Sequence, residues 1–428
     1  MKKFFAYLIA AVMFFTVSGA EKMNIRYPSV AKVMAKARKG GEITVVFFGG
    51  SLTFGANASD PGVTSFRALV MEMLRQKYPE AKWRFYDAAI GGTGSTLAIF
   101  RMERDIFRRK PDLVILDFTL NDILAGDAEG FTGWKNGAYE MILRQCLSRN
   151  TAVLPVFLAA QEHVTEPDIS RWKRRMEHLE LFEKYRLEYA DILKLMHRDF
   201  AAGKLDIAKI WEPELFDTIH PHDCGYAVYA EYFKSEWERI EALPEKTPVL
   251  PPSPLCGNHF DNFTRVEAVS LDLPGWQKCR PWIVADSFDW MASRWIDFVA
   301  MQGNCSLAGL AELKCVPDKK LRPLTLEFQA ETIALMVETL PESVGFTVSI
   351  DGGTPRRIRG RRVLRSQFHY LILGRNLDPH KLHTLHIVPE TPEAGSPGVM
   401  RWGSFLLNGA HKCFIRVSPV QAENQPIR

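Results

Sequence analysis

The chain has 428 residues, of which 46% are hydrophobic and 24% are charged, and its formal net charge is +4. This composition is typical of a globular protein and excludes a disordered chain. The near balance of charges gives no electrostatic basis for binding nucleic acid or an anionic membrane, and a chain of this length is expected to form two domains.

The first 20 residues have the pattern of a secretory signal peptide. Lys2 and Lys3 precede an apolar stretch over residues 4–17, and small residues follow at 18–20. This stretch is too short for a permanent membrane anchor. We therefore expect a secreted or periplasmic protein that has no integral membrane segment after signal cleavage.

From residue 42 to residue 239, apolar strand-like runs alternate with longer amphipathic stretches. The predicted strands cover 43–48, 83–90, 113–118 and 152–159. The predicted helices cover 64–77, 95–108, 133–148, 169–190 and 225–240. This alternation predicts an α/β domain, over residues 21–243, whose parallel sheet has helices on both faces.

The first predicted strand ends at two glycines, and a serine follows at once. Gly49 and Gly50 allow a sharp turn, which places Ser51 at the carboxyl end of a buried parallel strand. Ligands of open α/β sheets bind at this edge, where the hydroxyl group could act as a nucleophile. Taken alone, a serine after such a turn is more often only a cap or turn residue.

Two segments that could stabilise an oxyanion follow the next two strands. Residues 88–95 are rich in glycine, so the backbone N–H of Gly92 can approach a ligand closely. The segment lacks the lysine and the glycine spacing of nucleotide-binding loops. Asn121, within residues 117–122, offers a carboxamide donor. Both segments also fit ordinary turns or caps.

His163, after the fourth strand, could line the substrate cleft, but it is better interpreted as a surface-loop histidine.

The loop 216–221 carries an acid and a base in one short segment. Asp217 and His220 are three residues apart, so His220 could take the proton of Ser51 while Asp217 orients the imidazole ring. A helix cap before Pro221 is the alternative. The catalytic interpretation is favoured because all these segments end successive elements of one sheet, where they can converge.

The composition changes after residue 243. Five prolines within residues 242–257 predict an interdomain linker over 244–257. Short alternating runs then follow at 324–328, 333–337, 346–350 and 383–388. The sequence Asp351-Gly352-Gly353 predicts a hairpin, and the whole pattern predicts an all-β sandwich or jelly-roll domain over residues 258–428.

Aromatic and cysteine residues of the second half support no specific site. Four tryptophans there are better explained by core packing than by sugar stacking: Trp276, Trp282, Trp290 and Trp295. The chain has seven cysteines without metal-type spacing, so no metal site is predicted. Their pairing stays open, with Cys305 and Cys315 the closest pair in sequence.

Four segments, taken in order, resemble the four sequence blocks of the SGNH hydrolases, also called the GDSL esterase and lipase superfamily. They read Phe-Gly-Gly-Ser-Leu-Thr, Ile-Gly-Gly-Thr-Gly-Ser, Thr-Leu-Asn-Asp and Asp-Thr-Ile-His-Pro. The resemblance covers residues 42–243 and implies a flavodoxin-like three-layer α/β/α fold that hydrolyses esters. Gly50 departs from the family pattern, in which an acid that is not itself catalytic usually precedes the serine.

The resemblance also implies a role for each candidate site residue. Ser51 would be the nucleophile and a backbone donor to the oxyanion. Gly92 and Asn121 would supply the second and third oxyanion donors. His220 would be the general base, and Asp217 the acid that orients it.

The function expected from the sequence is that of an exported serine esterase for short acyl groups. The loop 54–62 is mostly small and polar, which favours a shallow site and an acetyl ester. A β-sandwich partner domain makes the chain resemble carbohydrate esterases, so O-acetyl groups of polysaccharides are the first substrate hypothesis. A lipid or aryl esterase is the alternative, and the complete set of catalytic residues disfavours a non-catalytic glycan-binding protein. No cofactor is expected.

Overall fold

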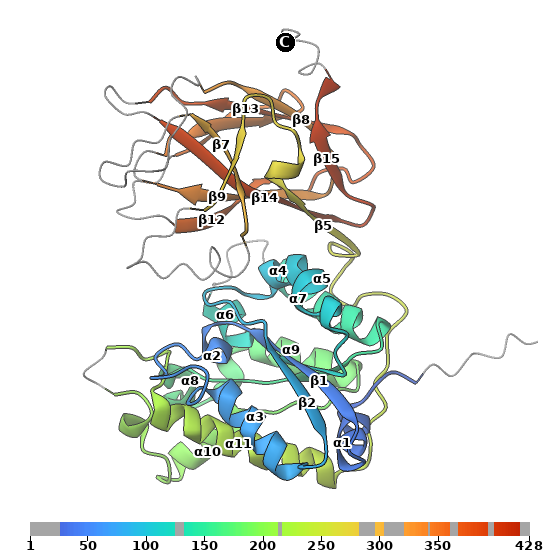
Figure 1. Ribbon diagram of the computed structural model, residues 1–428, viewed down its shortest axis with the longest axis vertical. Coiled ribbons are helices and arrows are strands. Elements are labelled where there is room, and N and C mark those ends of the chain that lie inside the picture. Colours follow the sequence, from blue (N-terminus) through green and yellow to red (C-terminus); the bar gives the residue numbers. More distant parts are fainter. Residues whose placement is uncertain are drawn as a thin grey trace, which may run out of the picture.

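The computed structural model describes residues 26–124, 132–212, 216–281, 296–303, 321–340, 343–359, 367–392 and 398–419. An α/β domain is followed by a β domain that lies above it in Figure 1. The predicted signal peptide, residues 1–20, lies outside the described residues.

Four parallel strands form the sheet of the α/β domain within the described residues. Their order is β2-β1-β3-β4. They are β1 (Glu42–Gly49), β2 (Lys82–Asp87), β3 (Leu113–Asp117) and β4 (Ala152–Pro155). Every residue of β3 and β4 is buried, as expected for a parallel sheet with both faces covered. A parallel bridge between Val156 and Ala190 extends the sheet beyond β4.

Helices cover both faces of this sheet (Figure 1). One layer contains α3 (Phe66–Lys77), α10 (Ile192–Ala201) and α11 (Asp223–Ala242). The layer nearer the β domain contains α4 (Ser95–Ala98), α7 (Thr132–Ser148) and α9 (Lys173–Lys184). Helix α1 (Val30–Arg38) packs against β1. The short helices are α2 (Ser51–Phe54), α5 (Met102–Asp105), α6 (Thr119–Leu124) and α8 (Gln161–Thr165), and the 3₁₀ turns of this domain are η1 (Ile99–Arg101), η2 (Phe107–Arg109), η3 (Ile169–Arg171) and η4 (Ile207–Lys209).

The predicted three-layer α/β/α fold is confirmed, but the single helix predicted over residues 169–190 is wrong. The chain forms η3 and then α9, which ends at Lys184, and Arg186 adopts a left-handed φ of 53°. The helix ends there because Ala190 must reach the sheet edge to pair with Val156. The helix predicted over 95–108 is instead a series of short α and 3₁₀ turns.

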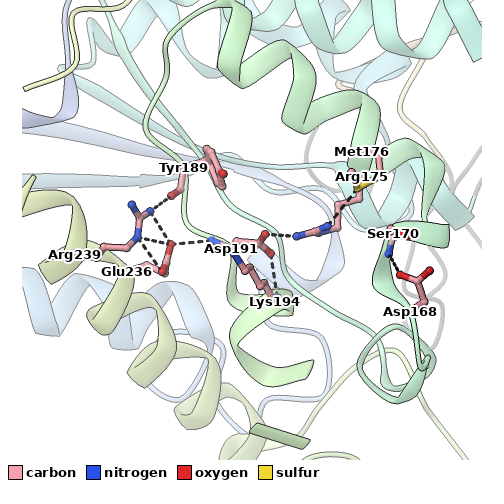
Figure 2. A network of polar contacts seen from close by, with 9 residues as sticks. All are labelled: Asp168, Ser170, Arg175, Met176, Tyr189, Asp191, Lys194, Glu236 and Arg239. Atoms are coloured by element: carbon pink, nitrogen blue, oxygen red, sulfur yellow. Dashed lines mark hydrogen bonds and ion pairs between the residues drawn. The ribbon is translucent and has the colours of Figure 1, made fainter. Parts of the chain in front are cut away.

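A buried polar network joins α9, α10 and α11 (Figure 2). Arg175 of α9 pairs with Asp191, the N-cap of α10, which also accepts a hydrogen bond from the backbone of Lys194 at 3.0 Å. The backbone N–H of Asp191 donates to Glu236 of α11 at 3.2 Å, and Glu236 pairs with Arg239. Burial raises the pKa of Asp191, while the charge of Arg175 opposes that rise. The network therefore fixes three helices relative to one another.

Two antiparallel sheets form the β domain within the described residues, which confirms the all-β prediction. Their orders are β11-β10-β13-β8-β15 and β12-β9-β14-β7-β6, and β5 also pairs with β14. The predicted hairpin is present, since β10 pairs with β11 across Asp351-Gly352-Gly353. The strands are β5 (Asn262–Glu267), β6 (Gln277–Cys279), β7 (Val299–Gly303), β8 (Leu324–Gln329), β9 (Thr332–Thr339), β10 (Phe346–Ile350), β11 (Arg356–Ile358), β12 (Gln367–Gly374), β13 (His383–Pro389), β14 (Val399–Gly409) and β15 (Phe414–Val417), with one 3₁₀ turn, η6 (Ala268–Ser270), after β5.

The segment between the domains is irregular but firmly held. Glu140 of α7 is fully buried, and its carboxylate accepts hydrogen bonds from the backbone of Leu255 and Cys256, each at 2.7 Å. Arg144 donates to the carbonyl of Pro251 at 2.9 Å. The proline-rich segment thus lies along α7, although the predicted limits of the linker and of the domains stay predictions.

Some sequence predictions for the second half lie outside the described residues. Trp276 is packed against Trp402, with ring centroids 4.3 Å apart, in agreement with the core interpretation. The residues that cannot be compared are Trp282, Trp290, Trp295, Cys305 and Cys315. Cys146, Cys224, Cys256 and Cys413 are free thiols.

Candidate active site

The serine of the first motif stands on a single helical turn directly after β1. Ser51 begins α2, with Gly50 as its N-cap, and it is 7% exposed. A Cβ atom on Gly49 would lie 2.1 Å from Thr53 Oγ1, and one on Gly50 would lie 2.1 Å from Asn121 Oδ1. Both glycines are therefore required for the close approach of α2 to its neighbours.

A line of hydrogen bonds runs from this serine through the loop before α11. Ser51 Oγ is 2.8 Å from His220 Nε2, and His220 Nδ1 is 2.8 Å from Asp217 Oδ2. In the neutral ring, Nδ1–H donates to the carboxylate and Nε2 accepts from the hydroxyl group. The structure thus brings these three predicted residues together in the geometry of a nucleophile, a base and an orienting acid.

Asp217 is held in its ionised form. Burial acts to raise its pKa, but hydrogen bonds from the backbone and ring of His220 and from the backbone of Ile219 outweigh burial and lower the pKa to about 2. A permanent negative charge beside Nδ1 favours the imidazolium that forms when the base accepts a proton. Phe216, the preceding residue, is 93% exposed and has a left-handed φ of 53°.

The two predicted oxyanion segments lie next to the serine turn. The side-chain amide of Asn121 in α6 packs against Gly50, so that a Cβ atom on this glycine would lie 2.1 Å from Asn121 Oδ1. Gly92 is exposed and has a left-handed φ of 70°, which glycine adopts without strain. The loop that carries it is tied to β1, because Ile90 N–H donates to Gly49 O at 3.0 Å. All five predicted site residues therefore stand at one edge of the sheet.

A layer of buried acids supports this edge from below. Asp117, at the end of β3, accepts a hydrogen bond from Thr53 Oγ1 at 2.9 Å, and its carbonyl accepts from Gly50 N–H at 3.3 Å. Burial, reinforced by the charge of Asp122, raises the pKa of Asp117 to about 7 despite the bond from Thr53. Asp122 accepts from the backbone of Ser95 at 2.9 Å. These acids hold α2 and the start of α4 in place.

Sequence reasoning missed two residues of the loop around the site. Asn57 Nδ2 donates to Asp217 Oδ2 at 3.0 Å. Asp223, the first residue of α11, accepts from the backbone of Ser59 at 2.8 Å and from Thr64 Oγ1 at 2.7 Å. Each contact joins segments about 160 residues apart, so no local pattern in the sequence could have indicated it.

His163 differs from its prediction as a surface-loop residue. It is only 1% exposed, and its ring lies 4.1 Å from the ring of Trp172. Burial lowers its pKa to about 4. The short helix α8 turns this side chain inward instead of into solvent, and the structure shows no hydrogen bond from it to the site.

The described residues contain no group of three His, Cys, Asp or Glu side chains suited to hold a metal ion.

A cavity of about 320 Å³ lies in the β domain, lined by Trp402, Phe346 and the buried pair Arg401 and Glu338. Arg401 Nε and Glu338 Oε2 are 2.6 Å apart, so these charges neutralise each other. Within the described ranges, no helix has both the length and the apolar character needed to cross a membrane.

The chain matches the GDSL-like Lipase/Acylhydrolase family over residues 47–228. This range contains the serine turn, both predicted oxyanion segments and the loop of His220. The comparison with curated proteins gives no match.

Two solved structures of one esterase share the fold over both domains. A two-domain esterase (CEX) active on acetylated mannans has a TM-score of 0.67 and 19% identity, covering 89% of this chain and 95% of that one. The same esterase co-crystallised with mannopentaose gives a TM-score of 0.66 at 19% identity, covering 90% and 96%. The acetyl xylan esterase AlAXEase gives 0.37 at 24% identity, covering 45% and 98%. At these identities, the likeness to CEX shows a common fold.

Proposed function

We propose that this chain, a carboxylic ester hydrolase whose residues 47–228 match the GDSL-like Lipase/Acylhydrolase family, is an exported serine esterase that removes O-acetyl groups from polysaccharides. The observation that carries the catalytic part is the line of two 2.8 Å hydrogen bonds from Ser51 through His220 to Asp217. A predicted signal peptide over residues 1–20 supports export.

In the proposed reaction, Ser51 Oγ attacks the ester carbonyl carbon while its proton moves to His220 Nε2. The negative charge on the former carbonyl oxygen is stabilised by the backbone N–H groups of Ser51 and Gly92 and by Asn121 Nδ2. His220 then gives its proton to the sugar oxygen as the bond between this oxygen and the former carbonyl carbon breaks, so that the sugar leaves as an alcohol and an acetyl-enzyme remains on Ser51. Water gives a proton to His220 and attacks the acetyl carbon; the bond to Ser51 Oγ then breaks, His220 returns the proton to this oxygen, and acetate leaves.

Several features support a small acyl group on a sugar. The loop 54–62 next to the nucleophile is mostly small and polar, and offers no large apolar surface for a fatty chain. Phe216 presents an exposed ring directly beside Asp217, and such a ring suits stacking on the apolar face of a pyranose. The two-domain esterase CEX, which is active on acetylated mannans, has a similar fold over both domains.

Acetate release from acetylated mannan, acetylated xylan and triacetin, compared with release of longer acids from triglycerides, tests the substrate class. We expect turnover of an acetylated polysaccharide and a fall in rate as the acyl chain lengthens. Activity that rises with acyl length, without acetate release from any polysaccharide, would favour the lipid or aryl esterase alternative.

The exposed ring of Phe216 allows a sharper test. Phe216→Ala should raise KM for acetylated oligosaccharides several-fold, because stacking contributes about 1 kcal/mol, while kcat/KM for p-nitrophenyl acetate stays within twofold. Val63→Ala, at another exposed apolar residue of the neighbouring loop, is the matched control. Equal losses on both substrates would argue against a sugar-stacking role.

A further inference from the structure

Asn57 lies in the loop after α2 and contacts the loop that carries Asp217 and His220. Its Nδ2 is 3.0 Å from Asp217 Oδ2 and 3.2 Å from the backbone oxygen of His220. Both partners are acceptors: the backbone oxygen of His220 can only accept, and the lowered pKa of Asp217 keeps its carboxylate ionised at neutral pH. Only the NH₂ end of an amide can face two acceptors, which fixes the orientation of this side chain.

This amide completes the set of donors around the carboxylate. Asp217 Oδ1 accepts from the backbone of Ile219 and of His220, each at 2.9 Å. Asp217 Oδ2 accepts from His220 Nδ1 at 2.8 Å and from Asn57. A carboxylate with two donors on each oxygen cannot rotate without breaking a charge-assisted hydrogen bond. The oxygen that orients the imidazole ring is therefore the one that Asn57 also holds.

The backbone around Asn57 is itself fixed. Its φ of 67° is in the left-handed region, which asparagine tolerates better than most residues. On one side, Ala56 O accepts from Tyr226 Oη at 2.6 Å, and on the other, Ala58 N–H donates to Gly55 O at 3.1 Å. A donor presented from such a turn positions its acceptor at little entropic cost.

From these contacts we infer that Asn57 is a positioning residue for the hydrolytic reaction, acting on His220 through Asp217; the inference rests on the proposed function. Asn57 keeps Oδ2 in line with His220 Nδ1. It also draws part of the negative charge of Oδ2 away from the ring, which makes the imidazolium less favourable.

Two substitutions separate these effects. Asn57→Gly keeps the left-handed turn and removes the amide, so kcat for p-nitrophenyl acetate should fall about tenfold with KM unchanged, as expected for a lost hydrogen bond to a charged group. Asn57→Asp keeps the shape but puts a second carboxylate beside Asp217. The added charge favours the imidazolium, so the acidic limb of the kcat/KM profile should move up by about one pH unit.

Ser59→Ala is the matched control, because the hydroxyl group of Ser59 lies on the same loop but donates to Asp223 and not to Asp217. It should leave the pH profile unchanged. The other titratable groups facing this region from α11 and its N-terminus, namely His222, Asp223 and Tyr226, are present in all three variants.

Wild-type kcat and an unshifted pH profile in both Asn57 variants would overturn the inference, as would an equal shift in Ser59→Ala. Thermal unfolding of each variant is measured as well. If Asn57→Gly loses kcat but keeps the wild-type melting temperature, the result supports a positioning role. Ser51→Ala distinguishes the two levels. If it is inactive while the Asn57 variants behave as wild type, only the role of Asn57 fails; if it retains full activity, the proposed function fails.

Discussion

Gly50 departs from the family pattern because the side chain of Asn121 lies directly against it. The amide of Asn121 occupies the position that a side chain at residue 50 would need, 2.1 Å from a Cβ. An acid at this position would displace Asn121 from its place beside the nucleophile turn. In this chain, the absence of a side chain at residue 50 therefore makes room for the Asn121 amide, which we propose as an oxyanion donor.

We predict that Gly50→Ala lowers kcat by about 10²-fold, the usual cost of losing one oxyanion donor, because the new methyl group displaces the Asn121 amide. Steady-state kinetics on p-nitrophenyl acetate measure the loss. In combination with Asn121→Ala, the double variant should be no slower than Asn121→Ala alone. Additive losses would show that Gly50 acts by another route.

Asp117 provides a prediction on stability. Its folded pKa of about 7 lies above the ordinary value of 3.8, so the folded state keeps a proton that the unfolded state releases as pH rises from about 4 to 7. This group therefore makes the protein less stable as pH rises through that window. Asp117→Asn, which keeps the shape, should gain about 2 kcal/mol relative to wild type between pH 5 and pH 7. Urea unfolding at both pH values measures this difference, and the same difference at both would contradict the assignment.

At the scale of the elements, the network of Figure 2 holds α9, α10 and α11 through two buried acids, Asp191 and Glu236. Arg175 and Asp191 are each 4% exposed. Removal of one partner leaves the other charge buried and unpaired, so Asp191→Ala should cost about 3–5 kcal/mol of unfolding free energy. Arg175→Met combined with Asp191→Leu should recover much of that loss. Denaturant unfolding checks both, and a loss below about 0.5 kcal/mol for Asp191→Ala, as at an exposed pair, would count against the network.

The elements also show what the sequence could and could not predict. Buried parallel strands and their terminal glycines and polar residues are local patterns, so Ser51, Asp217 and His220 could be identified and their common edge expected. The break after α9 could not, because it depends on the pairing of Ala190 with Val156, which are 34 positions apart (190 − 156). Asn57 was missed for the same reason, since its partner Asp217 is 160 residues away.

At the scale of the whole molecule, the apolar core of the α/β domain extends into the β domain, which also has a second buried cluster of its own. Phe260, Val299, Met336 and Leu406 of the second half belong to the same buried cluster as the helices of the α/β domain. Phe263 of β5 packs edge-on against Phe100 of η1, with ring centroids 6.0 Å apart. The linker along α7 adds polar contacts to this apolar interface, so the β domain is expected to be a fixed part of the enzyme.

This shared core predicts that both domains unfold together. Differential scanning calorimetry of the chain lacking residues 1–20 should show one transition, because unfolding either domain exposes apolar surface of the other. A chain ending at residue 243 should melt at a lower temperature and bind a hydrophobic dye. Two separate transitions, with the shortened chain melting as the first of them, would contradict a shared core.

The central claim is that Ser51 is the nucleophile, and covalent labelling tests it most directly. A fluorophosphonate should add one phosphonyl group per chain, peptide mass spectrometry should place it on Ser51, and labelling should abolish p-nitrophenyl acetate hydrolysis. Ser51→Ala should take up no label and should lose activity by at least about 10³-fold while keeping the wild-type melting temperature. A label on another residue, or full turnover by Ser51→Ala, would contradict the claim.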